Sequence, residues 1–566
     1  MRHNLDDKCL RLILAIALVL DIWAIWWGLP NTAEWDADSS VPMTTLRGAL
    51  NLFSFGWFGQ HQPLQPALIA LLCVPLFAYV YLTGGIDPSH VQRTYPWGLR
   101  DPEWVLSAVI LVGRLLSVFS HLLLIWAMYQ IGLRLRGRVT ALAAAVLGAL
   151  YYPFVYYAHA GNPDMLYMGL LAVAVLACFA FLEKPSARSI SWLAFWAALS
   201  TSVKFQALPF FAGMAPVVLW VLFADRRGSD PPGPVRARRG LGLSGLGLLI
   251  FVATFAVANN WILNFDSSIE WIANKKRGAE GSKETRAEWA RLADSIYAAD
   301  PMLKLGFAEG TWVCVSEGFS LPVLGLAALG LVLLAGAQPI KAAALVGPSI
   351  AYGAFYWYVN AAFDRYLFPI VVPLLLMAAL GAEWLWQLSC RSRGGRLIVT
   401  VSGIAVAVFL LARVVALDYV LLNGSRQQAE RWFADRPQYR GSTAIVYQNL
   451  DDAPRLRGLV RLVSLGPDSY FADKKNETDP KRHFRRPPVP DEVKSLEYLL
   501  SLDPEFVVLF PTDRPDNEVD YLLRTHPGKY RVVASFGGPT RLVRRTFAAN
   551  PKLQIWQRAR AMDADG

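Results

Sequence analysis

The sequence predicts a polytopic α-helical membrane protein with a small α/β domain after the membrane segments. Three observations support this fold class. The 566 residues are 54% hydrophobic and only 17% charged, whereas soluble proteins carry about a quarter charged residues. Apolar runs of spanning length recur as far as residue 418. After residue 418 the chain becomes rich in Arg, Asp and Pro, and it has no further run of that length.

Eleven apolar runs are predicted to cross the membrane. The first covers residues 10–30, and because no small-residue cleavage site follows it, we expect a retained span and not a signal peptide. The other ten are expected at about residues 104–130, 139–157, 164–182, 190–204, 206–224, 240–262, 317–336, 342–359, 366–388 and 397–418.

Basic loops predict the orientation of these spans, because Lys and Arg accumulate in short cytoplasmic loops. If residues 104–130 run inward, all of the basic loops fall on the cytoplasmic side. An equally basic N-terminus belongs there too, which leaves residues 64–83 as a juxtamembrane or re-entrant segment on the outer side. The alternative is twelve spans with an external N-terminus. The basic loops are residues 134–138, 184–188, 226–239, 341 and 391–396.

This orientation divides the chain into two predicted domains. Residues 1–418 form a transmembrane domain, with a first outer loop at 31–103 and a second outer loop at 263–316. Residues 419–566 form a small extracytoplasmic α/β domain. We expect its strands at 443–447, 506–510 and 531–536 and its helices at 425–435 and 491–502, with a further helix in the second outer loop at 284–298.

Several other functional classes are disfavoured by composition. Much of the net charge of +11 lies in short loops between apolar runs, so it reports orientation and does not predict nucleic-acid binding. The five cysteines show no paired spacing, and we expect neither a disulfide framework nor a zinc site. The chain has no Gly-rich phosphate loop.

Two carboxylates directly after the first span are the first candidates for chemistry. Asp36 and Asp38 have i, i+2 spacing, so in an extended loop they point the same way. Such a pair can accept a proton from a hydroxyl or hold a divalent cation. A loop between apolar segments also needs polar residues for solvation alone, so the pair does not define a site by itself.

The predicted topology brings further polar residues to the same outer face. Their residue types suit a lipid-linked phosphate held by cations, with carboxylates acting on an acceptor hydroxyl. Each has a structural alternative: the cations can snorkel to headgroups, the Asp after Pro163 can favour a helix N-terminus, and the His can be an interface residue. These residues are His159, Asn162, Asp164, Lys204 and Arg365.

Four motifs resemble the GT-C superfamily of membrane glycosyltransferases, in particular the protein O-mannosyltransferase and aminoarabinose transferase type (glycosyltransferase family 39-like). The resemblance covers roughly residues 10–390. The order and topology of the motifs carry it, since no single motif is specific. They are Trp35-Asp36-Ala37-Asp38, Ala158-His159-Ala160-Gly161-Asn162-Pro163-Asp164, Ser202-Val203-Lys204-Phe205-Gln206-Ala207-Leu208 and Asp364-Arg365-Tyr366-Leu367-Phe368-Pro369-Ile370-Val371-Val372-Pro373.

The resemblance implies a sugar donor carried on a polyprenyl phosphate and transfer to a hydroxyl of a protein, lipid or glycan, with inversion. It assigns the base to Asp36 with Asp38 as the competitor, because many relatives have an adjacent Asp-Glu pair where these acids are split. Asp164 becomes the second acid, which orients the acceptor or completes a Mg²⁺ or Mn²⁺ site with Asp36 and Asp38.

The same resemblance assigns Lys204 and Arg365 to the donor phosphate, and His159, Asn162 and Tyr366 to substrate binding. The expected location is a bacterial inner membrane with the active site on the periplasmic side. Two alternatives remain open: a transporter or flippase of lipid-linked saccharides, and an inactive subunit with the same fold. Against a transporter, the hydropathy shows no internal repeat.

Overall fold

The structure is a computed structural model of the whole chain. It describes residues 8–31, 34–35, 41–53, 62–87, 98–224, 233–265, 269, 311–312, 315, 318–359, 364–447, 454–456, 459–465, 504–509, 529–538, 542–543 and 550–559. The two loop carboxylates, Asp36 and Asp38, lie outside these residues. So do the helices predicted at 284–298 and 491–502.

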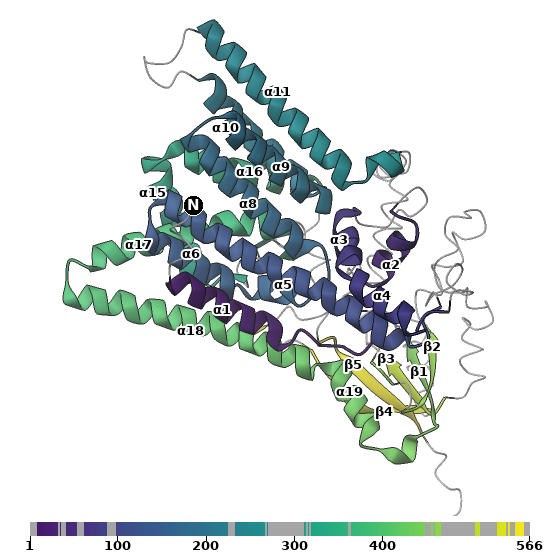
Figure 1. Cartoon of the computed structure of the whole chain (residues 1–566). Coiled ribbons are helices and arrows are strands. Elements are labelled where there is room, and N and C mark those ends of the chain that lie inside the picture. Colours follow the sequence, from purple (N-terminus) through teal and green to yellow (C-terminus); the bar gives the residue numbers. More distant parts are fainter. Residues whose placement is uncertain are drawn as a thin grey trace, which may run out of the picture.

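Every predicted span contains helical structure (Figure 1). By length and hydropathy, five of the described helices can each cross a membrane, or up to seven spans form if two bent pairs each count as one. The protein is therefore an integral membrane protein, while the count of eleven spans stays a prediction. The helices are α1 (Lys8–Trp23), α5 (Pro102–Leu135), α6 (Arg138–Leu150), α7 (Tyr152–Ala158), α8 (Asp164–Glu183), α9 (Ala187–Val203), α10 (Ala207–Phe223), α11 (Gly233–Ala258), α15 (Leu321–Ala337), α16 (Pro339–Val359), α17 (Phe368–Ser389) and α18 (Arg393–Asn423).

Two spans differ from their predicted form. The run at 139–157 is two helices, α6 and α7, bent by 59°, because Pro153 has no N–H to continue the ladder of α6. The first span is helical only to Trp23. Beyond it the carbonyls of Ile25 and Trp27 accept hydrogen bonds from the guanidinium of Arg114 at 2.6 and 2.8 Å, so this stretch departs from the helix.

The apolar residues 64–83 form two short helices, α3 (Leu64–Leu72) and α4 (Val74–Leu82), bent by 47°. Together with α2 (Met43–Leu50), they lie beside one end of α5 in Figure 1. Leu46 and Val80 pack there against Val105 and Leu106 of α5. The bend agrees with a juxtamembrane or re-entrant segment, and the length and hydropathy of the pair also fit a broken span.

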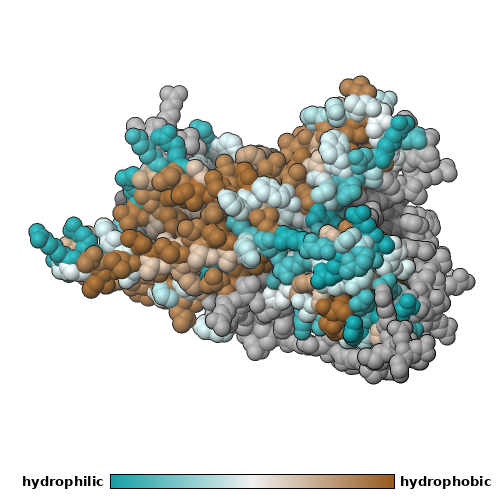
Figure 2. Space-filling model, turned by 90° about the horizontal axis from the view of Figure 1, so that it is seen from below, coloured by the Kyte–Doolittle hydropathy of each residue, from teal (hydrophilic) through white to brown (hydrophobic). Residues whose placement is uncertain are grey.

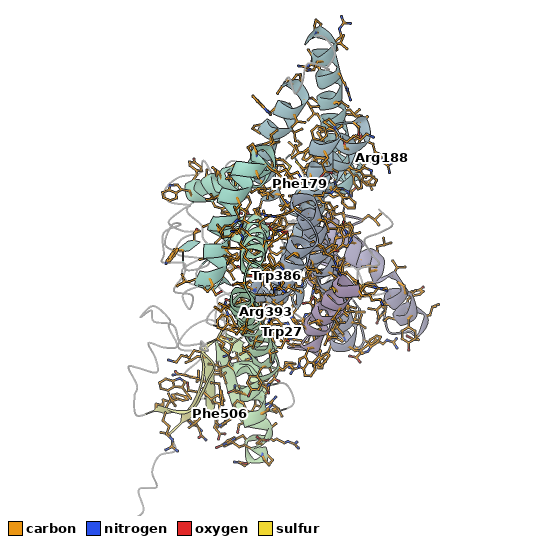
Figure 3. The ribbon with its side chains drawn as sticks, turned by 90° about the vertical axis from the view of Figure 1, so that its left-hand side faces the viewer. Trp27, Phe179, Arg188, Trp386, Arg393 and Phe506 are labelled. Atoms are coloured by element: carbon orange, nitrogen blue, oxygen red, sulfur yellow. The ribbon has the colours of Figure 1, made fainter. Side chains whose placement is uncertain are left out.

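The helices pack around a continuous apolar core, and glycines permit the closest contact. A Cβ on Gly330 of α15 would lie 1.8 Å from the carbonyl oxygen of Met377, and one on Gly381 of α17 would lie 2.2 Å from that of Leu326. The backbones of α15 and α17 therefore meet directly, a geometry typical of membrane helices. Figure 3 shows Phe179 inside this helical core.

Apolar side chains also cover the outside of the helices. Figure 2 shows a continuous hydrophobic surface over the helical part of the molecule. On α18 the exposed apolar side chains include Leu397, Val401, Ile404 and Val408. A surface of this kind suits contact with lipid and would be unfavourable in water.

Basic loops from distant parts of the sequence gather at one end of the bundle. Arg134 forms an ion pair with Glu183 and accepts a hydrogen bond at its carbonyl from Lys341, with 2.6 Å between the nitrogen and the oxygen. Arg136 lies 3.6 Å from Glu383. These contacts join the loops that the sequence assigns to the cytoplasmic side.

The C-terminal region, residues 419–566, contains a five-stranded mixed sheet at the other end of the bundle (Figure 1). The strand order is β2-β1-β3-β5-β4. The first three strands in this order are parallel, and β5 pairs antiparallel with β3 and β4. The strands are β1 (Thr443–Tyr447), β2 (Arg461–Leu465), β3 (Phe506–Leu509), β4 (Tyr530–Phe536) and β5 (Leu553–Arg558).

The helix α19 (Ser425–Ala434) packs on this sheet through Ala429 and Phe433, which share a core with Phe506; Figure 3 labels Phe506. The three predicted strands and the predicted helix 425–435 are present, whereas β2 and β5 were not predicted. The predicted boundary at residue 418 lies inside α18, which continues to Asn423.

Candidate active site

The segment between α7 and α8 is held by side chains from three other parts of the chain. The carbonyls of its residues 159, 160 and 161 accept hydrogen bonds from Trp27, Ser117 and Gln65 at 3.0, 2.7 and 3.0 Å. The N–H of Gly161 donates to the carboxylate of Glu34 at 3.0 and 3.1 Å. A buried loop needs partners of this kind for its backbone groups, and they fix the entry to α8.

Asp164 is the first residue of α8 and forms a buried ion pair. Its Oδ1 lies 2.6 Å from Nζ of Lys204, which directly follows α9. The two residues are 1% and 7% exposed. Asp164 Oδ2 is buried and has no hydrogen-bond partner among the described residues.

Arg365 lies in a 3-10 turn, Asp364–Leu367, directly before α17. Its Cζ is 5.3 Å from the centroid of the Tyr366 ring. Tyr366 stacks on Tyr356 of α16 at 5.1 Å, and Tyr356 contacts Tyr352 at 4.9 Å.

Tyr352 and Tyr356 are both buried. The ammonium group of Lys204 lies 5.9 Å from the ring centroid of Tyr167, another buried tyrosine. Each of the two predicted donor-phosphate cations thus lies beside a tyrosine: Lys204 beside Tyr167 of α8, and Arg365 beside Tyr366 in the turn before α17.

The other two predicted substrate residues make contacts within the protein. Nδ1 of His159 lies 2.7 Å from the carbonyl oxygen of Val155, and its Nε2 is 3.7 Å from Oδ1 of Asp418 in α18. The side chain of Asn162 accepts a hydrogen bond from the N–H of Asp164 at 3.2 Å and so supports the start of α8. Substrate contact by either residue stays a prediction.

Sequence reasoning missed the pair formed by Glu34 and Arg114. The Nε of Arg114 lies 2.6 Å from Oε1 of Glu34, and both side chains are completely buried. Arg114 occurs in the middle of an apolar run, and an intramembrane cation needs a partner. Its position was therefore the sequence signal from which a buried acidic partner could have been predicted. Glu34 is two residues before Asp36, and the pair anchors the described end of the first outer loop beside the Asp164 segment.

Comparison with protein families finds a match over part of the chain. Residues 103–231 match the dolichyl-phosphate-mannose-protein mannosyltransferase family. This match confirms the predicted resemblance over the stretch that contains Asp164 and Lys204. No curated protein matches the chain.

Three similar solved structures are distant from this chain in sequence. ArnT from Cupriavidus metallidurans bound to undecaprenyl phosphate is 14% identical, with a TM-score of 0.46 over 96% of this chain and 97% of that chain. AglB from Archaeoglobus fulgidus, with an inhibitory peptide and a dolichol-phosphate, is 10% identical, with a TM-score of 0.43 over 89% and 69%. The arabinofuranosyltransferase AftD from Mycobacteria is 16% identical, with a TM-score of 0.36 over 97% and 41%.

Proposed function

We propose that the protein transfers a sugar from a polyprenyl phosphate to an acceptor hydroxyl on the outer side of a bacterial inner membrane. The observation that carries this proposal is the buried Asp164–Lys204 pair, in which one carboxylate oxygen has no partner within the part of the chain that the structure describes. It lies within the stretch that matches a mannosyltransferase family whose donor is a polyprenyl-phosphate sugar. The basic loops gathered at the opposite end of the bundle support the orientation.

The reaction is a single displacement with inversion. Asp36 or Asp38 takes the proton of the acceptor hydroxyl, and the acceptor oxygen bonds to the anomeric carbon as the bond between that carbon and the phosphate oxygen breaks. The electron pair of that bond leaves with the polyprenyl phosphate. Lys204 and Arg365 stabilise the charge that develops on this phosphate, while Oδ2 of Asp164 accepts a hydrogen bond from the acceptor and orients it.

A divalent cation fits this site poorly at Asp164. The ammonium group of Lys204 lies 2.6 Å from one oxygen of that carboxylate, so a Mg²⁺ or Mn²⁺ ion on the other oxygen would be close to a like charge. Among the described residues no group of three or more His, Cys, Asp or Glu side chains is placed to hold a metal; Asp36 and Asp38 are outside that set. We therefore propose a mechanism in which Lys204 supplies the positive charge.

Sugar transfer by the purified protein in detergent tests the proposal. The protein is incubated with a panel of polyprenyl-phosphate sugars, with and without EDTA, and release of polyprenyl phosphate is measured. We expect release from one donor, insensitivity to EDTA and a loss of about 100-fold or more in Asp36→Asn or Asp38→Asn. The matched control is Asp435→Asn, which changes an exposed carboxylate after α19 and should keep wild-type turnover.

The outcomes separate the alternatives. Loss of turnover with EDTA would show that the reaction needs a divalent cation, contrary to the proposed mechanism. Intact donor with every sugar, together with tight binding of the lipid phosphate, would overturn the transferase and favour a transporter or an inactive binding subunit.

A further inference from the structure

Trp35 is buried although it belongs to an outer loop. Its side chain is 1% exposed and contacts the ring of Trp27, with 6.0 Å between centroids. Gly28 forms another wall: its φ is +71°, and a Cβ there would lie 2.6 Å from the Trp35 ring. The loop is therefore seated in a specific pocket at this residue.

Two arginines of the C-terminal region complete the pocket. Cζ of Arg426 in α19 lies 5.1 Å from the Trp35 ring, and Cζ of Arg455 lies 5.4 Å from it. Arg455 is itself oriented by two hydrogen bonds to Glu430, at 3.0 and 2.7 Å, and reaches the carbonyl of Pro30 at 3.4 Å. Guanidinium groups at such distances from an indole are attracted to its ring.

The preceding residue is held from the opposite side. Glu34 binds Arg114 of α5 and the N–H of Gly161, three residues before Asp164. Neighbouring residues of one loop are thus attached to the helical bundle on one side and to the C-terminal region on the other. Both contacts fix the described end of the loop, which directly precedes Asp36 in the sequence.

We propose that Trp35, Arg426 and Arg455 form a positioning clamp through which the C-terminal region holds the first outer loop against the Asp164 segment. For its effect on turnover, the clamp rests on the proposed function. Consecutive Cα atoms are about 3.8 Å apart, so a shift at Trp35 moves the backbone that carries the candidate base Asp36. A displacement of about 1 Å can slow a reaction about 100-fold, while the proposed donor-phosphate residues, Lys204 and Arg365, belong to other segments of the chain than the clamp.

The test uses the full-length protein and a double variant, Arg426→Lys/Arg455→Lys, which keeps both charges and removes the planar groups that stack on the ring. The variant Trp35→Leu breaks the same contact by removing the indole ring. The matched control is Arg436→Lys, whose guanidinium lies 4.4 Å from the ring of Trp432 within the C-terminal region. Hydrogen exchange of the peptide covering residues 29–43, kcat, the Kd for polyprenyl phosphate and the melting temperature are measured for each.

We expect exchange in this peptide to be at least about 10-fold faster in both clamp variants, and kcat to fall at least about 10-fold. The Kd should stay within about twofold, and the control should match the wild type in every readout. A variant that combines Trp35→Leu with the two arginine changes should differ little from either variant alone in exchange rate and in kcat, because all of these changes break the same contact. Where the double variant fails to fold, the single Arg455→Lys variant takes its place.

Unchanged exchange in folded clamp variants would overturn the clamp, and so would a fall in kcat that only follows loss of folded protein. The exchange measurement needs no sugar transfer. If the wild type transfers no sugar, the proposed function fails, and faster exchange in the clamp variants still establishes the contact.

Discussion

At the scale of single residues, the site depends on charges that are buried in pairs. Asp164 and Lys204 are 40 positions apart in the chain, and their attraction offsets part of the cost of burying both charges. Glu34 and Arg114, 80 positions apart, do the same for the first outer loop. Removing one partner of such a pair should therefore destabilise the fold more than removing both.

We expect Lys204→Met to lower the free energy of unfolding by about 3–5 kcal/mol, since it leaves a buried carboxylate without its partner. The double variant Lys204→Met/Asp164→Leu should recover most of this loss and still be inactive. Denaturation in detergent, with turnover measured in parallel, checks both statements. Equal losses of stability in the single and double variants would contradict the pairing.

Arg365 should act on donor affinity. Because a hydrogen bond between charged groups contributes about 1.5–3 kcal/mol, Arg365→Ala should weaken binding of polyprenyl phosphate about 10- to 100-fold. Arg396→Ala, which changes an exposed arginine near the start of α18, serves as the control. Equal affinities of the two variants, measured by titration with the lipid phosphate, would remove Arg365 from the phosphate site.

At the scale of elements, the position of each helix depends on how closely its neighbours approach. The contact of α15 with α17 requires glycine at position 330, where a Cβ would overlap backbone atoms of α17. Where α6 ends, Pro153 breaks one predicted span into two helices. Local sequence thus sets the bends, and small residues set the spacing.

The glycine contact can be tested within one helix. Gly330→Ala should destabilise the protein by at least about 1–3 kcal/mol because α15 and α17 must move apart. Gly336→Ala, also in α15, adds a Cβ that meets nothing within 4 Å and should be neutral or slightly stabilising. Melting temperatures in one detergent compare them, and similar losses for both would contradict the close contact.

At the scale of the whole molecule, the chain has two unlike ends. One end carries the joined basic loops, and the other carries α2–α4 and the sheet (Figure 1). The Asp164–Lys204 pair lies at the start of α8, and Glu183 of the basic end is the last residue of that helix. The C-terminal region contacts the bundle through Arg413 of α18, whose Nε donates to the carbonyl of Leu542, between β4 and β5, at 3.0 Å. We therefore expect the basic end to lie on the cytoplasmic side of the membrane and the sheet on the outer side.

Cysteine labelling in intact cells tests this orientation. In a background whose native cysteines are replaced by serine, Asp435→Cys should react with a membrane-impermeant maleimide once the outer membrane is permeable. A restored Cys390, exposed at the basic end, should react only after the inner membrane is opened. The reverse pattern would place the site on the cytoplasmic side.

The sequence by itself determined the location of the apolar helices, the membrane class, three strands of the sheet and the motifs around Asp164, Lys204 and Arg365. All of these depend on local composition, periodicity or residue type. It did not reveal β2 and β5, because short strands become recognisable mainly through their pairing. Only the tertiary structure joined Asp164 to Lys204, paired Glu34 with Arg114 and placed two arginines of the C-terminal region on Trp35. Contacts between residues so far apart in the chain leave no local pattern, because they form only when separate elements pack together.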